Sequence, residues 1–253
     1  MIRTEARDGV HRIAIDRPER RNAIDTATTD LLVEAIGRAQ ADPEARVLVI
    51  KGVGDTFCAG RDLRAQAERA DETGVERDPW AGQQAWAEIF QRLQRGPVPS
   101  VAVVRGHAVA GGFTLAMACD YVLADRTAVF GAFEMRNGFA ATICTPLLSR
   151  LVGPRLGLEF ATFGEAIPAE RLLACGLINR LAEDAADLAR IEVEFVGRLA
   201  ALDRGAVRMT REIFRAAETM PIAEALTMGK HMNNLIAATG GFAQAGRKLG
   251  KKN

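Results

Sequence analysis

The chain reads RGHAVAGGFTLAMACD from residue 105 to residue 120, with adjacent glycines at Gly111 and Gly112. An apolar run typical of a buried strand, 101–104, precedes this stretch, and residues 113–118 suit a buried helix. The first turn of a helix carries unpaired backbone N–H groups, and glycine lets a ligand oxygen approach them. The pattern predicts either an anion-binding turn or close packing of helix on strand, and one such turn alone favours packing.

A second glycine turn follows another apolar run. Residues 47–50 lead into KGVGDTFCAGRDL at 51–63. A dinucleotide fingerprint is excluded, because the third glycine of GxGxxG would fall on Phe57. The chain also has no GxxxxGK[ST], GxSxG or HExxH motif. Two turns with backbone hydrogen-bond donors therefore remain as the candidate chemistry.

Composition narrows the class of protein. The chain has 253 residues, 48% of them hydrophobic and 26% charged, with a net charge of +1. This length suits one large core, or a core with a smaller lobe, and the low charge favours neither nucleic acid nor an anionic membrane as a partner. The start MIRTEARD lacks the apolar part of a signal peptide, so we expect a cytoplasmic protein. The four cysteines form no CxxC pair, so we expect no metal site and no disulfide framework.

Strands alternate with helices in the first two thirds of the chain, and helices dominate after residue 154. Asp25 or Thr26 is expected to cap a helix that ends before Pro43, and Pro221 is expected to start a later one. The charged segment 64–82 is either a mobile connection or a solvated helix. The predicted strands are 10–15, 47–50, 101–104 and 121–124.

These motifs carry a family resemblance. FCAGRDL at 57–63 and GHAVAGGFTLAMACD at 106–120 resemble the paired oxyanion-hole motifs of the enoyl-CoA hydratase/isomerase (crotonase) superfamily. Three further stretches are similar to the amino-terminal motif of that family, to its strand bearing a catalytic acid, and to the helix-turn-strand that follows: IDRPERRNAID at 15–25, AVFGAFEMRNGF at 128–139 and residues 151–181.

The resemblance implies the fold, the assembly and the substrate class. The expected fold is α/β, a crotonase-like repeated ββα spiral over residues 1–195 with a C-terminal helical trimerisation lobe over residues 196–253. The implied assembly is a homotrimer or homohexamer. The implied substrate is an acyl-CoA thioester of the kind met in fatty acid metabolism. Coenzyme A then belongs to the substrate, and no separate cofactor is expected.

The resemblance also implies roles for single residues. The backbone N–H groups of Arg61 and Gly111 would form an oxyanion hole, and Glu134 would be the general acid/base. An apolar site between Phe130, Phe133 and Phe139 would raise the pKa of Glu134. Substrate-binding roles are expected for Ala59, Arg61, Gly112, Thr114 and Phe139, and contacts to CoA phosphates for Arg20, Arg21 and Lys248. The Arg61 side chain itself either reaches a CoA phosphate or is a solvated surface arginine.

Departures from the family pattern bear on the reaction. Thr114 stands where two-acid hydratases of this family have a second glutamate, and Thr142 stands where dienoyl-CoA isomerases have an aspartate. A single glutamate resembles the 3,2-enoyl-CoA isomerases, although such a chain is readily named an enoyl-CoA hydratase. The alternative is a catalytically silent member that binds acyl-CoA or a protein. We interpret His107 as a turn residue, with polarisation of a substrate as the alternative, and expect Asp62 and Asp120 to tie down turns. Cys58 and Cys144 either are simply buried thiols, which we favour, or line the acyl pocket.

Overall fold

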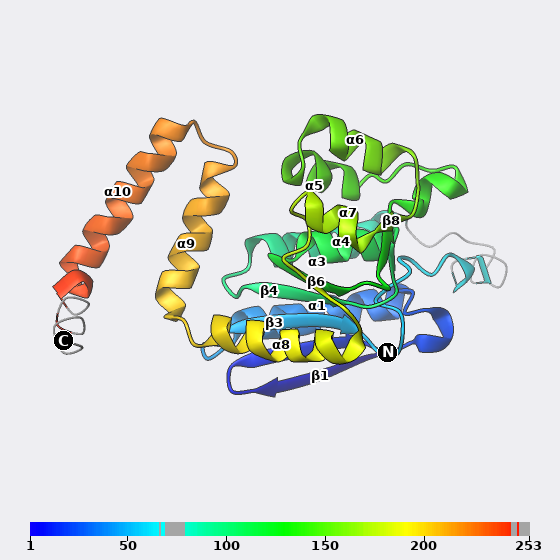
Figure 1. Ribbon diagram of the computed structural model, residues 1–253, viewed down its shortest axis with the longest axis horizontal. Helices are drawn as coiled ribbons and strands as arrows, with labels where there is room; N and C mark the ends of the chain where they lie inside the picture. Colours follow the sequence, from blue (N-terminus) through cyan, green and yellow to red (C-terminus); the bar gives the residue numbers. More distant parts are fainter. Residues whose placement is uncertain (66, 69–78, 244–246, 248–253) are drawn as a thin grey trace. The chain divides into compact units, whose positions relative to one another are not determined.

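The computed structural model describes residues 1–65, 67–68, 79–243 and 247 of the chain. It divides into two compact units, Met1–Ala201 and Leu202–Asn253 (Figure 1). The boundary predicted at residue 195 falls inside helix α8 (Ala185–Ala200). Because Val196 and Leu199 of α8 pack with strand residues in one buried cluster, the whole of α8 belongs to the first unit.

One sheet of six strands organises the first unit. The strand order is β1-β2-β3-β4-β6-β9, with β1 antiparallel to β2 and the other neighbours parallel. All four predicted strands belong to this sheet. Its strands are β1 (Ile2–Arg7), β2 (Val10–Ile15), β3 (Val47–Gly52), β4 (Ser100–Val104), β6 (Tyr121–Asp125) and β9 (Arg180–Ala182).

Helices cover both faces of this sheet, which explains why its central strands are continuously apolar. Successive residues of β3 alternate between faces: Val47 and Val49 pack against α8, while Leu48 and Ile50 join the larger core. Among the helices that contribute residues to the larger core are α1 (Thr26–Ala41), α3 (Pro79–Arg95) and α4 (Gly111–Ala118). Asp25 caps α1 by accepting a hydrogen bond from the Thr28 N–H at 2.8 Å, as predicted.

A second, three-stranded sheet explains the repeat. It consists of β5 (His107–Val109), β7 (Val129–Gly131) and β8 (Ile167–Pro168), in the order β5-β7-β8. Two successive repeats, β4-β5-α4 and β6-β7-η2, each send one strand to the large sheet and the next to the small sheet before a helix begins. This arrangement is the expected ββα spiral. The short 3₁₀ and α-helices are η1 (Pro18–Arg20), η2 (Phe133–Asn137), α5 (Cys144–Leu151), α6 (Pro154–Thr162) and α7 (Ala169–Ala174).

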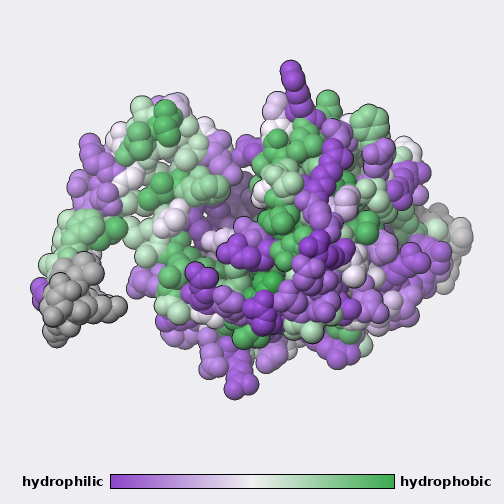
Figure 2. Space-filling model, in the orientation of Figure 1, coloured by the Kyte–Doolittle hydropathy of each residue, from purple (hydrophilic) through white to green (hydrophobic). Residues whose placement is uncertain are grey.

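The second unit contains α9 (Arg204–Ala217) and α10 (Ile222–Ala238), and α10 begins directly after Pro221 as predicted. Three of the six large apolar side chains of α10 are exposed in the single chain, among them Ile222 at 72% and Leu226 at 68%. Figure 2 shows apolar residues gathered on this unit. A trimerisation role for it stays a prediction.

Most of segment 64–82 lies outside the described residues, and its last residues begin α3 at Pro79. In the described part of the chain, no helix combines the length and the apolar character needed to span a bilayer.

Candidate active site

The two glycine turns lie against each other. Cys58 and Ala108 form a parallel β-bridge, in which Cys58 N–H donates to His107 O at 3.0 Å and Val109 N–H donates to Cys58 O at 3.1 Å. Arg61 follows Cys58 by the same number of residues as Gly111 follows Ala108. A Cβ built on Gly60 would lie 2.7 Å from the Gly111 nitrogen. The backbones that carry the two predicted donors are therefore neighbours.

Both predicted donors are available. Across the described residues, neither the Arg61 N–H nor the Gly111 N–H donates a hydrogen bond within the protein. Ala110, just before Gly111, has φ +51° and ψ −127°, a conformation that costs a non-glycine residue roughly 1–3 kcal/mol. It is held there by hydrogen bonds from its N–H to Gly131 O at 2.8 Å and from Thr114 N–H to its carbonyl at 3.1 Å. Backbone strain therefore accompanies the start of α4.

Packing explains why both residues at the start of α4 are glycines. A Cβ on Gly111 would lie 2.4 Å from Trp86 Cζ2, and a Cβ on Gly112 would lie 2.0 Å from Cys58 O. Either contact is far shorter than van der Waals distance. The packing interpretation therefore holds for both glycines. The approach of a ligand oxygen to these N–H groups stays a prediction.

A polar network fixes the Gly60–Arg61 turn. Arg17 Nη2 forms ion pairs with Asp25 at 3.0 Å and with Asp62 at 3.1 Å. The fully buried Asn22 donates from Nδ2 to Val53 O at 3.0 Å and to Thr56 O at 2.6 Å. Sequence reasoning assigned no role to Arg17 or Asn22, although both lie in the amino-terminal motif.

Both aspartates that were expected to tie down turns do so. Asp62 Oδ1 accepts a hydrogen bond from Ala65 N–H at 3.1 Å. Asp120 Oδ2 accepts hydrogen bonds from Ser100 N–H at 2.7 Å and from Ser100 Oγ at 2.8 Å. These predictions are confirmed, and the two acids are committed to structural hydrogen bonds.

Glu134 lies on the 3₁₀ helix η2, directly after β7, and not on a strand as the family motif led us to expect. The strand ends at Gly131 because the chain turns at Ala132, whose carbonyl accepts a hydrogen bond from Met135 N–H at 3.4 Å. Glu134 Oε2 is buried and finds no hydrogen-bond partner among the described residues. Burial raises the pKa of the Glu134 carboxyl, in the direction predicted.

The three aromatic residues expected around Glu134 differ in their surroundings. Phe130 is fully buried and packs edge-to-face on Phe113, with ring centroids 6.0 Å apart. The Arg136 guanidinium lies over the Phe133 ring at 3.5 Å from its centroid. Phe139 is 44% exposed, and its N–H donates to Glu134 O at 3.3 Å. Of the three rings only that of Phe130 is fully buried, and Phe139 is exposed in the single chain.

Thr114 and Cys144 bring the glutamate and the glycine turn together. The fully buried Cys144 thiol is a hydrogen-bond partner of the Thr114 hydroxyl, and the Glu134 charge acts on the same thiol. Thr114 Oγ1 also donates to Ala110 O at 3.4 Å. Burial raises the pKa of Cys144 to about 12, so this group is a neutral thiol. The prediction of a buried Cys144 thiol is confirmed, and a place for it in the acyl pocket stays a prediction.

Two of the three residues predicted to contact CoA phosphates lie in the described part of the chain. Arg20 is half-buried, and its Nη2 lies 3.8 Å from Glu68 Oε1, whereas Arg21 contributes its carbonyl oxygen to a 3.1 Å hydrogen bond from Ala59 N–H. Lys248 lies outside the described residues.

His107 is exposed at the start of β5. Over the described residues, no three His, Cys, Asp or Glu side chains are grouped as a metal site.

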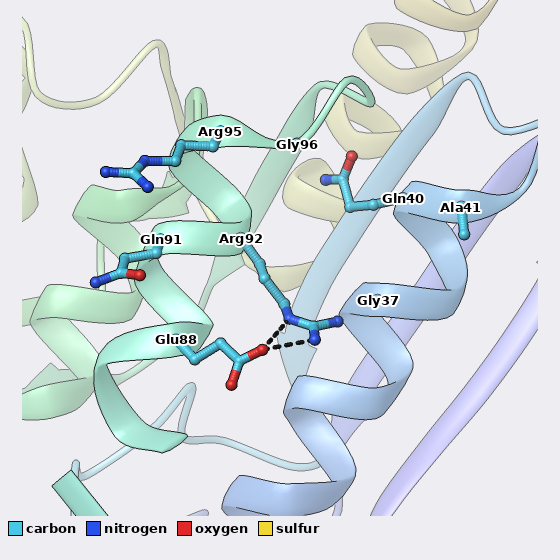
Figure 3. A pocket seen from close by; sticks show the side chains of 8 residues that line it. All are labelled: Gly37, Gln40, Ala41, Glu88, Gln91, Arg92, Arg95 and Gly96. Atoms are coloured by element: carbon cyan, nitrogen blue, oxygen red, sulfur yellow. Dashed lines mark hydrogen bonds and ion pairs between the residues drawn. The ribbon is translucent and has the colours of Figure 1, made fainter. Parts of the chain in front are cut away.

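A separate hollow of about 470 Å³ lies between α1 and α3 (Figure 3). Its polar groups are largely satisfied: Arg92 pairs with Glu88 at 2.6 Å, and Gln40 exchanges two hydrogen bonds with the Val98 backbone at 3.2 and 2.7 Å. None of the predicted site residues lines it. We therefore place the candidate site at the glycine turns.

Known proteins are similar to this chain over nearly its whole length. The enoyl-CoA hydratase/isomerase family profile matches residues 5–246. The chain belongs to this family. A Thermus thermophilus protein provisionally named an enoyl-CoA hydratase is 32% identical over 242 residues, which cover 95% of this chain and 94% of the relative. Carnitinyl-CoA dehydratase of Salmonella typhimurium is 34% identical over 215 residues, covering 84% of this chain and 79% of the relative.

Solved structures of the enoyl-CoA hydratase/isomerase family share the fold. The crystal structure of an enoyl-CoA hydratase from Polaromonas sp. JS666 superimposes with a TM-score of 0.87 at 27% identity, covering 99% of this chain and 97% of that one. The α/β fold with a helical C-terminal region is therefore that of the crotonase enzymes.

Proposed function

We propose that this family member converts 3-enoyl-CoA thioesters to 2-enoyl-CoA thioesters through an enolate, with Glu134 as the single acid/base. One observation carries the proposal. Among the described residues, the N–H groups of Arg61 and Gly111 donate no hydrogen bond and belong to neighbouring backbones, and the buried Glu134 Oε2 has no hydrogen-bond partner. The Glu134 charge acts on the Cys144 thiol, which is also a partner of Thr114 in α4. The names of the relatives support the substrate class, because carnitinyl-CoA dehydratase and mevalonyl-CoA hydratase are both named for CoA thioesters.

The proposed chemistry uses charge that develops during the reaction. Glu134 removes a proton from C2, negative charge moves to the thioester oxygen, and the two N–H groups stabilise it. Glu134 then returns the proton to C4. Removing one such donor typically raises the barrier by about 2.7–4 kcal/mol. Preorganised backbone donors supply this stabilisation without a metal ion or a charged side chain at the oxygen.

Thr114 favours isomerisation over hydration. Hydration must activate a water molecule and also exchange a proton at C2, and the family's two-acid enzymes divide this work between two glutamates. Thr114 cannot accept a proton at neutral pH, and its hydroxyl is already engaged with Ala110 O and Cys144. A single carboxylate is sufficient to move one proton between two carbons.

The test compares both reactions on the same protein with matched acyl chains. Glu134→Gln should abolish deuterium exchange at C2 and leave thioester binding nearly intact, because the oxyanion donors are backbone groups. Thr114→Ala should lower the exchange rate much less. Fast hydration that survives Glu134→Gln would refute the assignment of the base, and fast hydration that depends on Glu134 would make the protein a hydratase.

A catalytically silent acyl-CoA-binding member is the second candidate, because Thr114 replaces an acid of the two-acid enzymes. It predicts that the purified protein binds CoA thioesters and never exchanges the C2 proton. Deuterium incorporation followed by mass spectrometry separates the two candidates in one experiment.

A further inference from the structure

The Arg61 side chain is free of the role proposed for its backbone. It is half-buried, and its guanidinium carbon lies 5.6 Å from the centroid of the Trp86 ring. Over the residues that the structure describes, no carboxylate forms an ion pair with it. A partly desolvated cation therefore stacks on an aromatic ring and has no anionic partner in the described part of the chain.

Trp86 fixes where this cation lies. The indole is buried on α3, where it packs edge-to-face on Phe90 with ring centroids 5.1 Å apart. Its Cζ2 edge approaches so closely that a Cβ on Gly111 would lie 2.4 Å away. The same ring therefore contacts the start of α4 and carries the Arg61 guanidinium. The cation is held beside the proposed oxyanion hole by a rigid buried residue.

An anionic partner would stabilise the Arg61 guanidinium in this position. Taking a guanidinium partly out of water is unfavourable, and burial lowers the pKa of Arg61. Stacking on an indole offsets part of that cost. A charge-assisted pair with a carboxylate would offset more, since the planar guanidinium matches a carboxylate with two parallel hydrogen bonds.

We propose that the Arg61 guanidinium binds a carboxylate carried by the acyl group, so that the preferred substrates are acyl-CoA thioesters with an anionic acyl chain. This inference rests on the proposed function, because it places the thioester carbonyl at the Arg61 and Gly111 N–H groups. A CoA phosphate is the other anion within the same ligand. The long pantetheine arm separates those phosphates from the thioester, whereas Trp86 holds the guanidinium close to Gly111.

The experiment measures Kd by calorimetry for two matched pairs of thioesters, glutaryl-CoA with pentanoyl-CoA and adipyl-CoA with hexanoyl-CoA. Each pair differs only in a terminal carboxylate in place of a methyl group. Arg61→Met keeps an unbranched stem against Trp86 and removes the charge, and Arg61→Gln is a second neutral variant. Arg155→Met removes an exposed arginine at the start of α6 and serves as the matched control.

We expect the wild-type protein to prefer the carboxylate member of at least one pair. The ratio of the Kd of the methyl member to the Kd of the carboxylate member should fall about 10- to 100-fold in Arg61→Met and Arg61→Gln, the range for a hydrogen-bonded charge. In Arg155→Met this ratio should stay unchanged. A preference retained by a folded neutral Arg61 variant would overturn the inference, as would the absence of any wild-type preference in both pairs. Equal losses for free CoA and for all four thioesters would assign Arg61 to a phosphate and also overturn it.

The two proposals fail differently. A wild-type protein that binds none of the four thioesters contradicts the proposed function itself. A protein that binds all of them with an Arg61-independent preference contradicts only the carboxylate site.

Discussion

Glu134 is held where its neutral form is favoured, since burial raises the pKa of its carboxyl. Proton abstraction needs the ionised form. We therefore predict that the rate of C2 exchange rises with pH through a midpoint above that of an exposed glutamate, then levels off. Exchange measured by mass spectrometry across a pH series checks this. A rate that is flat from about pH 4 to 8 would contradict it.

The same pKa shift makes the folded state less stable as the pH rises, whereas it makes the exchange rate increase. The folded state binds the Glu134 proton more tightly than the unfolded state does, so the free energy of unfolding is highest below the unfolded-state pKa. It falls as the pH rises from that value to the raised folded-state pKa. Glu134→Gln should remove this fall, which urea titrations of both proteins at several pH values would show.

The buried thiols should be chemically inert. Burial raises the pKa of both Cys58 and Cys144 to about 12, and only the thiolate reacts with alkylating agents. We expect iodoacetamide at about pH 8 to leave both unmodified in the folded protein and to modify the half-buried Cys175 faster. Peptide mass spectrometry gives the sites, and denatured protein is the control. Equal labelling of Cys144 and Cys175 would show that the region opens.

At the scale of elements, the contact between α4 and the Cys58 segment tolerates no side chain. Gly112→Ala places a Cβ about 2.0 Å from Cys58 O, so we expect a loss of about 1–3 kcal/mol in the free energy of unfolding. Gly197→Ala in α8 is the matched control, because no atom lies within 4 Å of its added Cβ. It should stabilise by up to about 1 kcal/mol. Equal effects of the two changes in urea titrations would contradict this account.

The Gly60–Arg61 turn offers a second paired test, in which activity is the readout. Gly60 has φ +89°, and its Cβ would lie 2.7 Å from the Gly111 nitrogen; Gly54 has φ +81° and its nearest neighbour is 3.6 Å away. Both alanine variants carry similar backbone strain. Only Gly60→Ala disturbs a proposed oxyanion donor, so its C2 exchange should fall about 10²- to 10³-fold, and that of Gly54→Ala far less. Comparable losses would show that strain alone is responsible.

At the scale of the whole molecule, the exposed apolar side chains of α10 bear on assembly. Ile222, Leu226 and Leu235 are 72%, 68% and 61% exposed in the single chain. Covering such side chains with a partner lowers the free energy, because apolar surface is removed from water. We predict a homotrimer or a homohexamer by light scattering, and dissociation when Leu226→Glu and Leu235→Glu are combined. Asn234→Glu on the same helix is the control, and a wild-type monomer would contradict the prediction.

The local sequence determined many of the elements in both units. Continuous apolar runs such as Val47–Ile50 predicted strands covered on both faces, and Asp25 and Pro221 marked helix starts, because periodicity and capping act over a few residues. The motif order also indicated the repeat and the family. The division of the chain was less accessible: α8 continues past the predicted boundary because it packs on a sheet whose strands are distant in sequence.

The sequence could name Arg61, Gly111, Thr114 and Glu134 as candidates, but it could not show how they meet. The bridge between Cys58 and Ala108 joins two turns that are far apart along the chain, and Glu134 leaves its strand for a 3₁₀ helix. Trp86 shares no motif with Arg61, yet it carries the Arg61 guanidinium. Local patterns determined which elements form, whereas only tertiary packing decided which N–H groups stay free and which charges lack partners, because both depend on neighbours distant in sequence.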